Sequence, residues 1–128
     1  MKKTKHSYTD LKYHLVIVPK YRKEILKGNL AELVRKVILA GWMGHHYIQI
    51  IEYAIQSDHV HIFFQARPDT RLVREISKLK TEITKWAFIK DKDLEKKLGS
   101  RNLWSRGYFL SSTGINAAVV ANYINKQK

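Results

Sequence analysis

Two histidines one residue apart, His59 and His61, are the side chains of this sequence best suited to metal chemistry. Val60 and Ile62 alternate with them along an apolar run. Because alternate residues of a β-strand point to opposite faces, both imidazoles would leave one face and both aliphatic side chains the other. Two imidazoles on one face can bind a single divalent ion, for which histidine is the commonest protein ligand. The motif alone is equally consistent with a solvent-facing or hydrogen-bonded pair that binds no metal.

A tyrosine and a glutamine near the end of the sequence could complete such a site. Residues 116–128 are predicted to form a helix, because apolar residues recur at helical spacing: Ala117, Val120, Ala121 and Ile124. Tyr123 and Gln127 stand one turn apart on another face, so a hydroxyl and an amide oxygen would project the same way. Two imidazoles, an amide oxygen and a phenol together suggest an open three-ligand metal site with an oxygen nucleophile. Alternatively, the Tyr123 ring only packs against its neighbours. Gln127 lies near the end of the helix, where helices fray, so its role as a ligand is less secure than that of the histidines.

The composition points to a polyanionic partner. Twenty-four Lys and Arg against 11 Asp and Glu give a formal net charge of +13 on 128 residues. A generally basic surface and a ribosome-associated protein remain alternatives, but 45% hydrophobic residues with scattered charge speak against a disordered basic tail. The absence of cysteine excludes disulfides and thiolate metal sites and is typical of a reducing interior. Without a long apolar span or a signal-peptide pattern, we expect a cytoplasmic protein with no membrane partner.

The remaining elements are predicted from hydrophobic periodicity. We expect strands at 13–19, 47–53, 59–65 and 103–110, a first helix that ends at Gly41, and a charged connector at 91–99. The second helix would be capped by Asp69 or Thr70 and would bury one stripe, formed by Leu72, Ile76, Leu79, Ile83 and Trp86. The order β-α-β-β-α-β-α predicts an α+β fold in which helices cover an antiparallel sheet. We expect one domain over residues 1–128, ferredoxin-like (split βαβ) and similar to an RNA-recognition sheet.

Four segments, taken in order, resemble the transposases of the IS200/IS605 type. These are LKYHLVIVPKYR (11–22), DHVH (58–61), LWSRGYF (103–109) and YINKQ (123–127). This family is the single-tyrosine branch of the His-hydrophobe-His (HUH) nuclease superfamily. The resemblance covers nearly the whole chain and also implies the split βαβ topology.

The resemblance implies a specific chemistry. Tyr123 would be the nucleophile, and His59, His61 and Gln127 would hold a divalent metal, Mg²⁺ or Mn²⁺. Mn²⁺ should bind better in vitro, because it accepts mixed nitrogen and oxygen ligands. Cleavage of single-stranded DNA at hairpin-bearing transposon ends would leave a 5′-phosphotyrosine and a free 3′-hydroxyl. Either Lys126 or the metal could favour the phenolate.

The family also implies a homodimer in which each active site combines the histidines of one subunit with Tyr123 of the other. Basic residues on two segments could follow the DNA backbone, although single charged side chains are usually only solvated. These are Lys12, Lys20, Arg22, Lys23, Arg71, Arg74 and Lys78. Near the histidines, Asp58 could cap the turn or hydrogen-bond a ligating histidine, and His14 could reach the site from a neighbouring strand. Trp104 and Tyr108 are expected in the core rather than stacked on bases.

Two alternatives remain open. A domesticated relative would use the same chemistry on chromosomal palindromes. A non-catalytic module that binds single-stranded nucleic acid could share the fold, although the glycine- and aromatic-rich stacking pattern of that class is absent here. Only an enzyme would form a covalent adduct with DNA.

Overall fold

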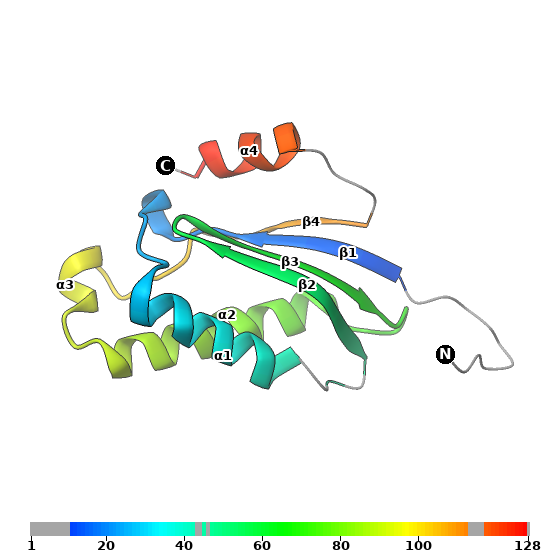
Figure 1. The fold of residues 1–128 in the computed structure, drawn as a ribbon, viewed down its shortest axis with the longest axis horizontal. Coiled ribbons are helices and arrows are strands. Elements are labelled where there is room, and N and C mark those ends of the chain that lie inside the picture. The colour runs from blue at the N-terminus through cyan, green and yellow to red at the C-terminus, as the bar shows by residue number, and fades with distance from the viewer. Residues whose placement is uncertain (1–10, 43–44, 46, 113–116, 128) are drawn as a thin grey trace, which may run out of the picture.

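The computed structural model describes residues 11–42, 45, 47–112 and 117–127 (Figure 1). The expected order of strands and helices is confirmed, with one short helix added. The elements are β1 (Leu11–Ile17), the 3₁₀ turn η1 (Lys20–Arg22), α1 (Gly28–Trp42), β2 (Ile48–Gln56), β3 (His59–Ala66), α2 (Leu72–Lys90), α3 (Leu94–Leu98), β4 (Phe109–Ser111) and α4 (Ala117–Asn125). None of the helices described is long and apolar enough to cross a membrane.

The four strands form one antiparallel sheet in the order β2-β3-β1-β4, as the split βαβ prediction requires. The central strands β1 and β3 pair along their length, with His14 opposite Phe63 and Val16 opposite His61. Helices α1 and α2 lie against one face of the sheet, and α4 lies over the other (Figure 1). The single domain therefore has a sheet with two differently covered faces.

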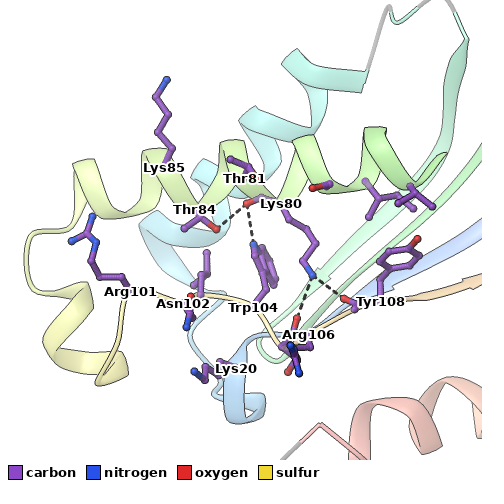
Figure 2. A pocket seen from close by; sticks show the side chains of 16 residues that line it. Lys20, Lys80, Thr81, Thr84, Lys85, Arg101, Asn102, Trp104, Arg106 and Tyr108 are labelled. Carbon is purple, nitrogen blue, oxygen red and sulfur yellow. Dashed lines mark hydrogen bonds between the residues drawn. The ribbon is translucent and has the colours of Figure 1, made fainter. Parts of the chain in front are cut away.

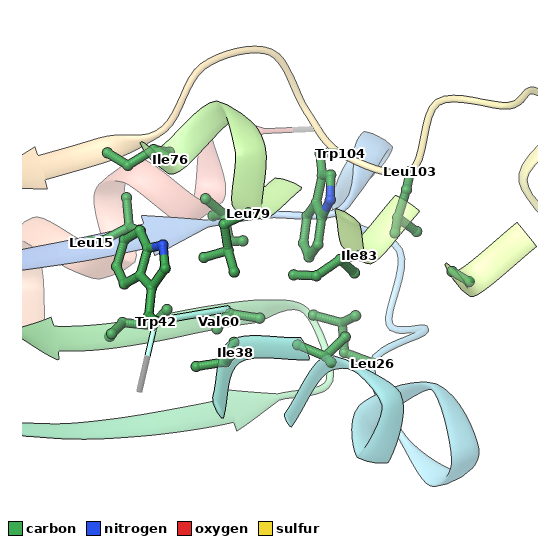
Figure 3. Packing of buried hydrophobic residues seen from close by; sticks show 14 of the residues in the cluster. Leu15, Leu26, Ile38, Trp42, Val60, Ile76, Leu79, Ile83, Leu103 and Trp104 are labelled. Atoms are coloured by element: carbon green, nitrogen blue, oxygen red, sulfur yellow. The ribbon is translucent and has the colours of Figure 1, made fainter. Parts of the chain in front are cut away.

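The main core lies between the sheet and helices α1 and α2. In β3 the even-numbered residues are buried and the odd-numbered ones half-buried, as the alternation predicted. Phe64 stacks on Tyr13 of β1, with ring centroids 5.6 Å apart, and meets the edge of Trp42 of α1 at 4.9 Å. Figure 3 shows side chains of α1, α2 and β3, including Ile38 and Ile83, meeting in this layer.

A second, smaller apolar cluster attaches α4 to the opposite face. Ile124 of α4 packs on Val16 and Val18, which are fully buried, and Phe109 lies at its border. The predicted helix over 116–128 is shorter in the structure, where α4 spans Ala117–Asn125. Residues 116 and 128 lie outside the described part of the chain.

Two predictions for the segment between α2 and β4 were wrong. The expected connector at 91–99 contains α3, because Leu94 and Leu98 stand one helical turn apart and both bury their side chains. The expected strand at 103–110 is reduced to β4, because Gly107 turns the chain with a φ of +71°. Trp104 forms an isolated bridge with Pro19, two residues beyond the end of β1.

Smaller differences concern the two long helices. Helix α1 ends at Trp42, one residue beyond Gly41. Arg71, rather than Asp69 or Thr70, occupies the N-cap of α2, and no side chain caps that end. Trp86 is 37% exposed, because Ala87 occupies the inward-facing position that the sequence analysis predicted for Trp86. Periodicity thus identified both helices but misplaced their ends.

Candidate active site

His59 and His61 leave the sheet on the face that α4 covers, as the spacing predicted. A tight turn after β2 brings Asp58 beside the first histidine, with 2.9 Å between Asp58 Oδ1 and His59 Nδ1. An ionised carboxylate can only accept a hydrogen bond, so Nδ1 carries the proton and donates it. The Nε2 lone pair of His59 therefore remains available for a ligand. Of the two roles considered for Asp58 from the sequence, the hydrogen bond to a histidine is the one that this contact supports.

His14 lies beside His61, as considered from the sequence. His14 Nδ1 is 3.0 Å from His61 Nε2, and the His14 ring stacks on Phe63 with centroids 4.4 Å apart. Burial, followed by the neighbouring His14 and His59 rings, lowers the pKa of His61. A neutral imidazole is the form that binds metals, so His61 is kept in that form at neutral pH.

Tyr123 lies on α4 with its ring against Phe109, at a centroid distance of 5.6 Å. Phe109 pairs with Val16, and Val16 pairs with His61, so these residues form one row across the same face of the sheet. Burial raises the pKa of the Tyr123 phenol. Among the described residues, no hydrogen bond joins its hydroxyl to either histidine. The phenol is therefore protonated at neutral pH, and its activation requires a cation or a base.

Gln127 lies beyond the end of α4 rather than on its last turn. Its backbone N–H donates to the carbonyl of Ile124, and its Nε2 donates to the carbonyl of Tyr123 at 3.2 Å. The expected continuation of the helix to this residue was wrong, but the side chain folds back against the turn that carries Tyr123. Its Oε1 atom has no partner among the described residues and can accept a ligand.

The two histidines on this face are candidate ligands for a divalent metal. No group of three His, Cys, Asp or Glu side chains that could hold a metal occurs in the described part of the chain. A third protein ligand beside the ring nitrogens of His59 and His61 would therefore come from another residue type, and the amide oxygen of Gln127 is a candidate. Two neutral nitrogens with one neutral oxygen fit Mn²⁺, and Mg²⁺ in the presence of additional oxygen ligands.

The basic residues expected to contact DNA fall into three places. Lys12 is exposed on β1, on the same strand face as His14. Lys20 and Arg22 form η1, and the ammonium of Lys23 donates to the carbonyl of Lys97. Three others are exposed on the first half of α2: Arg71, Arg74 and Lys78. They do not form one patch around the histidines.

Sequence reasoning did not single out a basic hollow on the α2 side, which includes Lys80, Arg101 and Arg106. Only Lys20 among the expected DNA-contact residues borders it. Trp104, 8% exposed, and the half-buried Tyr108 pack on the main core as expected, and both also line this hollow. The segment LWSRGYF could have indicated this hollow from the sequence, because two of its aromatic side chains flank an arginine.

Comparison with known proteins gives the family. The family model described as "Transposase IS200 like" matches residues 7–127. The chain belongs to the IS200-like transposase family. It is 30% identical to the ISDra2 transposase TnpA of Deinococcus radiodurans over 128 residues, which cover 99% of this chain and 91% of the relative. It is also 28% identical to the transposase of insertion sequence IS200 of Salmonella typhimurium over 124 residues, covering 95% of this chain and 80% of the relative.

Two solved structures share the fold of this transposase. A structure described as a transposase of Deinococcus radiodurans R1 superposes with a TM-score of 0.79 at 24% identity, covering 99% of this chain and 98% of the other. A REP-associated tyrosine transposase, solved with a REP hairpin, gives a TM-score of 0.58 at 12% identity, covering 98% and 69%. The fold and the resemblance to the IS200/IS605 single-tyrosine transposases are thus confirmed. The protein is an IS200-type transposase, and its family acts on DNA.

Proposed function

We propose that this transposase cuts and rejoins one DNA strand through a covalent bond between Tyr123 and a 5′-phosphate. The observation that carries the proposal is the common face of the sheet, which bears His59, His61 and the helix of Tyr123. On that face His59 and His61 are half-buried rather than enclosed in the core, so a phosphate can approach them.

The covalent step balances without an external reactant. The Tyr123 hydroxyl loses its proton, and its oxygen forms a bond to the scissile phosphorus while the bond to the 3′ oxygen breaks. The departing 3′ oxygen takes up a proton and becomes a free hydroxyl. Reversal, with a 3′-hydroxyl attacking the phosphotyrosine, rejoins DNA without ATP, because the ester is conserved on the enzyme.

His59, His61 and Gln127 would hold the divalent ion, Mg²⁺ or Mn²⁺. When bound, such an ion supplies positive charge that polarises the scissile phosphate and orients it. Asp58 fixes the tautomer of His59, and His14 orients the His61 ring. Because burial disfavours the Tyr123 phenolate, a positive charge close to its oxygen is required, which the ion or Lys126 would provide.

The substrate we propose is single-stranded DNA whose transposon ends carry hairpins. The net charge of +13 favours a nucleic acid, and a single nucleophile attacks only one strand. A structural relative has been solved with a REP hairpin, which supports a hairpin-bearing substrate and keeps chromosomal palindromes as the second candidate. The greater similarity to insertion-sequence transposases favours transposon ends.

We also propose a homodimer with shared active sites. In the single chain, α4 packs on its own sheet through Ile124 and a small apolar cluster. Among the described residues, the main core has 19 buried side chains and this cluster three, so little apolar contact opposes movement of α4 to a partner.

The test is a covalent adduct on a denaturing gel. Hairpin-bearing single-stranded DNA labelled at its 3′ end is incubated with the protein and Mn²⁺, since the phosphotyrosine retains the 3′ fragment. We expect the wild type to form an adduct and Tyr123→Phe to form none, because the variant lacks the attacking oxygen. Tyr13→Phe is the matched control, since it removes the same atom on the opposite face of the sheet. An adduct that persists in Tyr123→Phe would assign the nucleophile elsewhere and refute the proposal.

A further inference from the structure

A hollow of about 790 Å³ lies between α2 and residues 101–108, on the side of the sheet away from α4 (Figure 2). Its lining includes five basic side chains and no Asp or Glu among the described residues. The basic ones are Lys20, Lys80, Lys85, Arg101 and Arg106. Hydroxyl groups of Ser and Thr and the rings of Trp104 and Tyr108 complete the wall. We call this hollow the α2 groove.

The wall of the α2 groove is fixed by Lys80. Its half-buried ammonium donates to the carbonyls of Ser105, at 3.2 Å, and Gly107, at 2.8 Å. The indole N–H of Trp104 returns a hydrogen bond to the carbonyl of Lys80 at 3.3 Å, as the dashed lines of Figure 2 show. The hydrogen bonds of Lys80 therefore hold the segment from Trp104 to Gly107 against α2. The groove is preformed in the absence of a ligand.

Other cations of the α2 groove remain available. Arg101 pairs with Glu95 at 3.0 Å, and the Lys85 side chain points away from the groove in Figure 2. Lys20 and Arg106 contact no carboxylate among the described residues. Both side chains line the groove. The Lys20 ammonium lies 5.3 Å from the centre of the Tyr21 ring, and neither cation is neutralised by a carboxylate of the described residues. Two such cations beside a preformed hollow are suited to the phosphates of a flexible strand.

The turn η1 connects the α2 groove with the helix that carries Tyr123. Lys20 lines the groove, while the guanidinium of Arg22 donates to the side-chain oxygen of Asn125 on α4. Tyr21 and Arg22 have φ values of +60° and +53°, which residues other than glycine rarely adopt. Such strain persists where the surrounding structure imposes it, often at functional sites. Tyr21 itself is 57% exposed.

We propose that the α2 groove and η1 bind a single-stranded segment of the DNA substrate. Its phosphates contact Lys20 and Arg106, and one base stacks on Tyr21 on the path to α4. The volume is in the range of pockets for small ligands, so we expect the groove to accommodate one or two nucleotides. The inference rests on the proposed function for the identity of the ligand as DNA.

The experiment measures binding of a fluorescent thymidine oligonucleotide to the full chain in EDTA, where no cleavage occurs. The variant is Lys20→Ala with Arg106→Ala. The matched control is Lys36→Ala with Lys90→Ala, which removes the same charge beside a different hollow that contains Glu32 and Asp91. We expect the groove variant to lose at least about tenfold in affinity and the salt slope to fall by about 1.4, against little change in the control. Thermal unfolding checks that both variants are folded.

The stacking contact is tested separately at Tyr21. Tyr21→Asn keeps a residue that tolerates positive φ but removes the ring, and Tyr21→Phe keeps the ring. We expect roughly tenfold weaker binding in Tyr21→Asn and near wild-type binding in Tyr21→Phe. If the groove variant and its control lose affinity equally, or if only a fully paired hairpin binds less well, the inference is wrong. Because this assay does not require the phosphotyrosine, its failure is distinguishable from failure of the adduct test.

Discussion

The two faces of the sheet differ in how they are covered. The face toward α1 and α2 buries a continuous layer of aliphatic and aromatic side chains, whereas the face toward α4 buries three side chains in the described part of the chain, Val16, Val18 and Ile124. The second face carries His14, His59 and His61 instead. A single strand therefore contributes buried side chains to the core and histidines to the opposite face, because its alternate side chains point to opposite faces of the sheet. Stability comes mainly from one face, which leaves the other free to carry polar chemistry.

The same separation appears in adjacent residues of β3. Phe64 is fully buried against Tyr13 and Trp42, whereas Phe63 is half-buried and stacks on His14. This pair allows the comparison between the faces to be tested with one chemical change at two neighbouring positions.

The largest expected effect is on folding. Phe64→Ala should lower the free energy of unfolding by about 3–5 kcal/mol, because it leaves a cavity in a closed core. Phe63→Ala should cost roughly 1 kcal/mol, because its face is open and water replaces part of the lost contact. Urea titration of both variants measures the difference. Equal losses would show that the α4 face contributes to stability as much as the helix-covered face.

The next effect is on metal binding without loss of the fold. His59→Ala or His61→Ala should abolish Mn²⁺ binding and strand cleavage, because two imidazoles supply most of the donor set. Binding of hairpin DNA should remain largely intact, since phosphate contacts carry the affinity. Isothermal calorimetry with Mn²⁺ and anisotropy with hairpin DNA measure the two quantities. An unchanged Mn²⁺ affinity in either variant would exclude the site on β3.

A partial recovery of activity, expected when two inactive variants are mixed, tests whether Tyr123 on α4 acts with the histidines of its own chain or with those of a partner. Tyr123→Phe and His59→Ala proteins, each inactive alone, are mixed and allowed to exchange subunits. With shared sites, a mixed dimer has one complete site, so random pairing should restore roughly a quarter of wild-type activity. If activity stays absent while exchange is demonstrated by differently tagged subunits, each chain builds its own site.

The smallest effect concerns the pH dependence of stability. Because the pKa of His61 is lowered in the folded protein, folding favours its neutral form. Its contribution to stability is therefore complete above the unfolded pKa of about 6.5 and is lost as the pH falls through the folded value. In metal-free buffer, the free energy of unfolding should decline below pH 6.5 in the wild type and decline less in His61→Gln. Parallel curves would show that the titration of His61 does not contribute.

Local pattern in the sequence was sufficient for much of the face that α4 covers. Alternation along β3 determined that His59 and His61 share a face, because side-chain direction in a strand depends only on the period of two. Helical spacing placed Tyr123 on the final helix, and the excess of basic residues indicated a polyanionic partner. These properties depend on neighbours in the chain, so they can be read before folding is known.

Tertiary structure alone decided which distant residues meet. The register of β1 against β3 brings His14 to His61, and no local pattern contains that register. The α2 groove likewise requires Lys80 to capture two carbonyls about 25 residues later in the chain. The end of α4 before Gln127 was also not predictable, because the last turn depends on what it packs against. Contacts between distant segments are fixed by packing of the whole chain, and a linear periodicity carries no information about them.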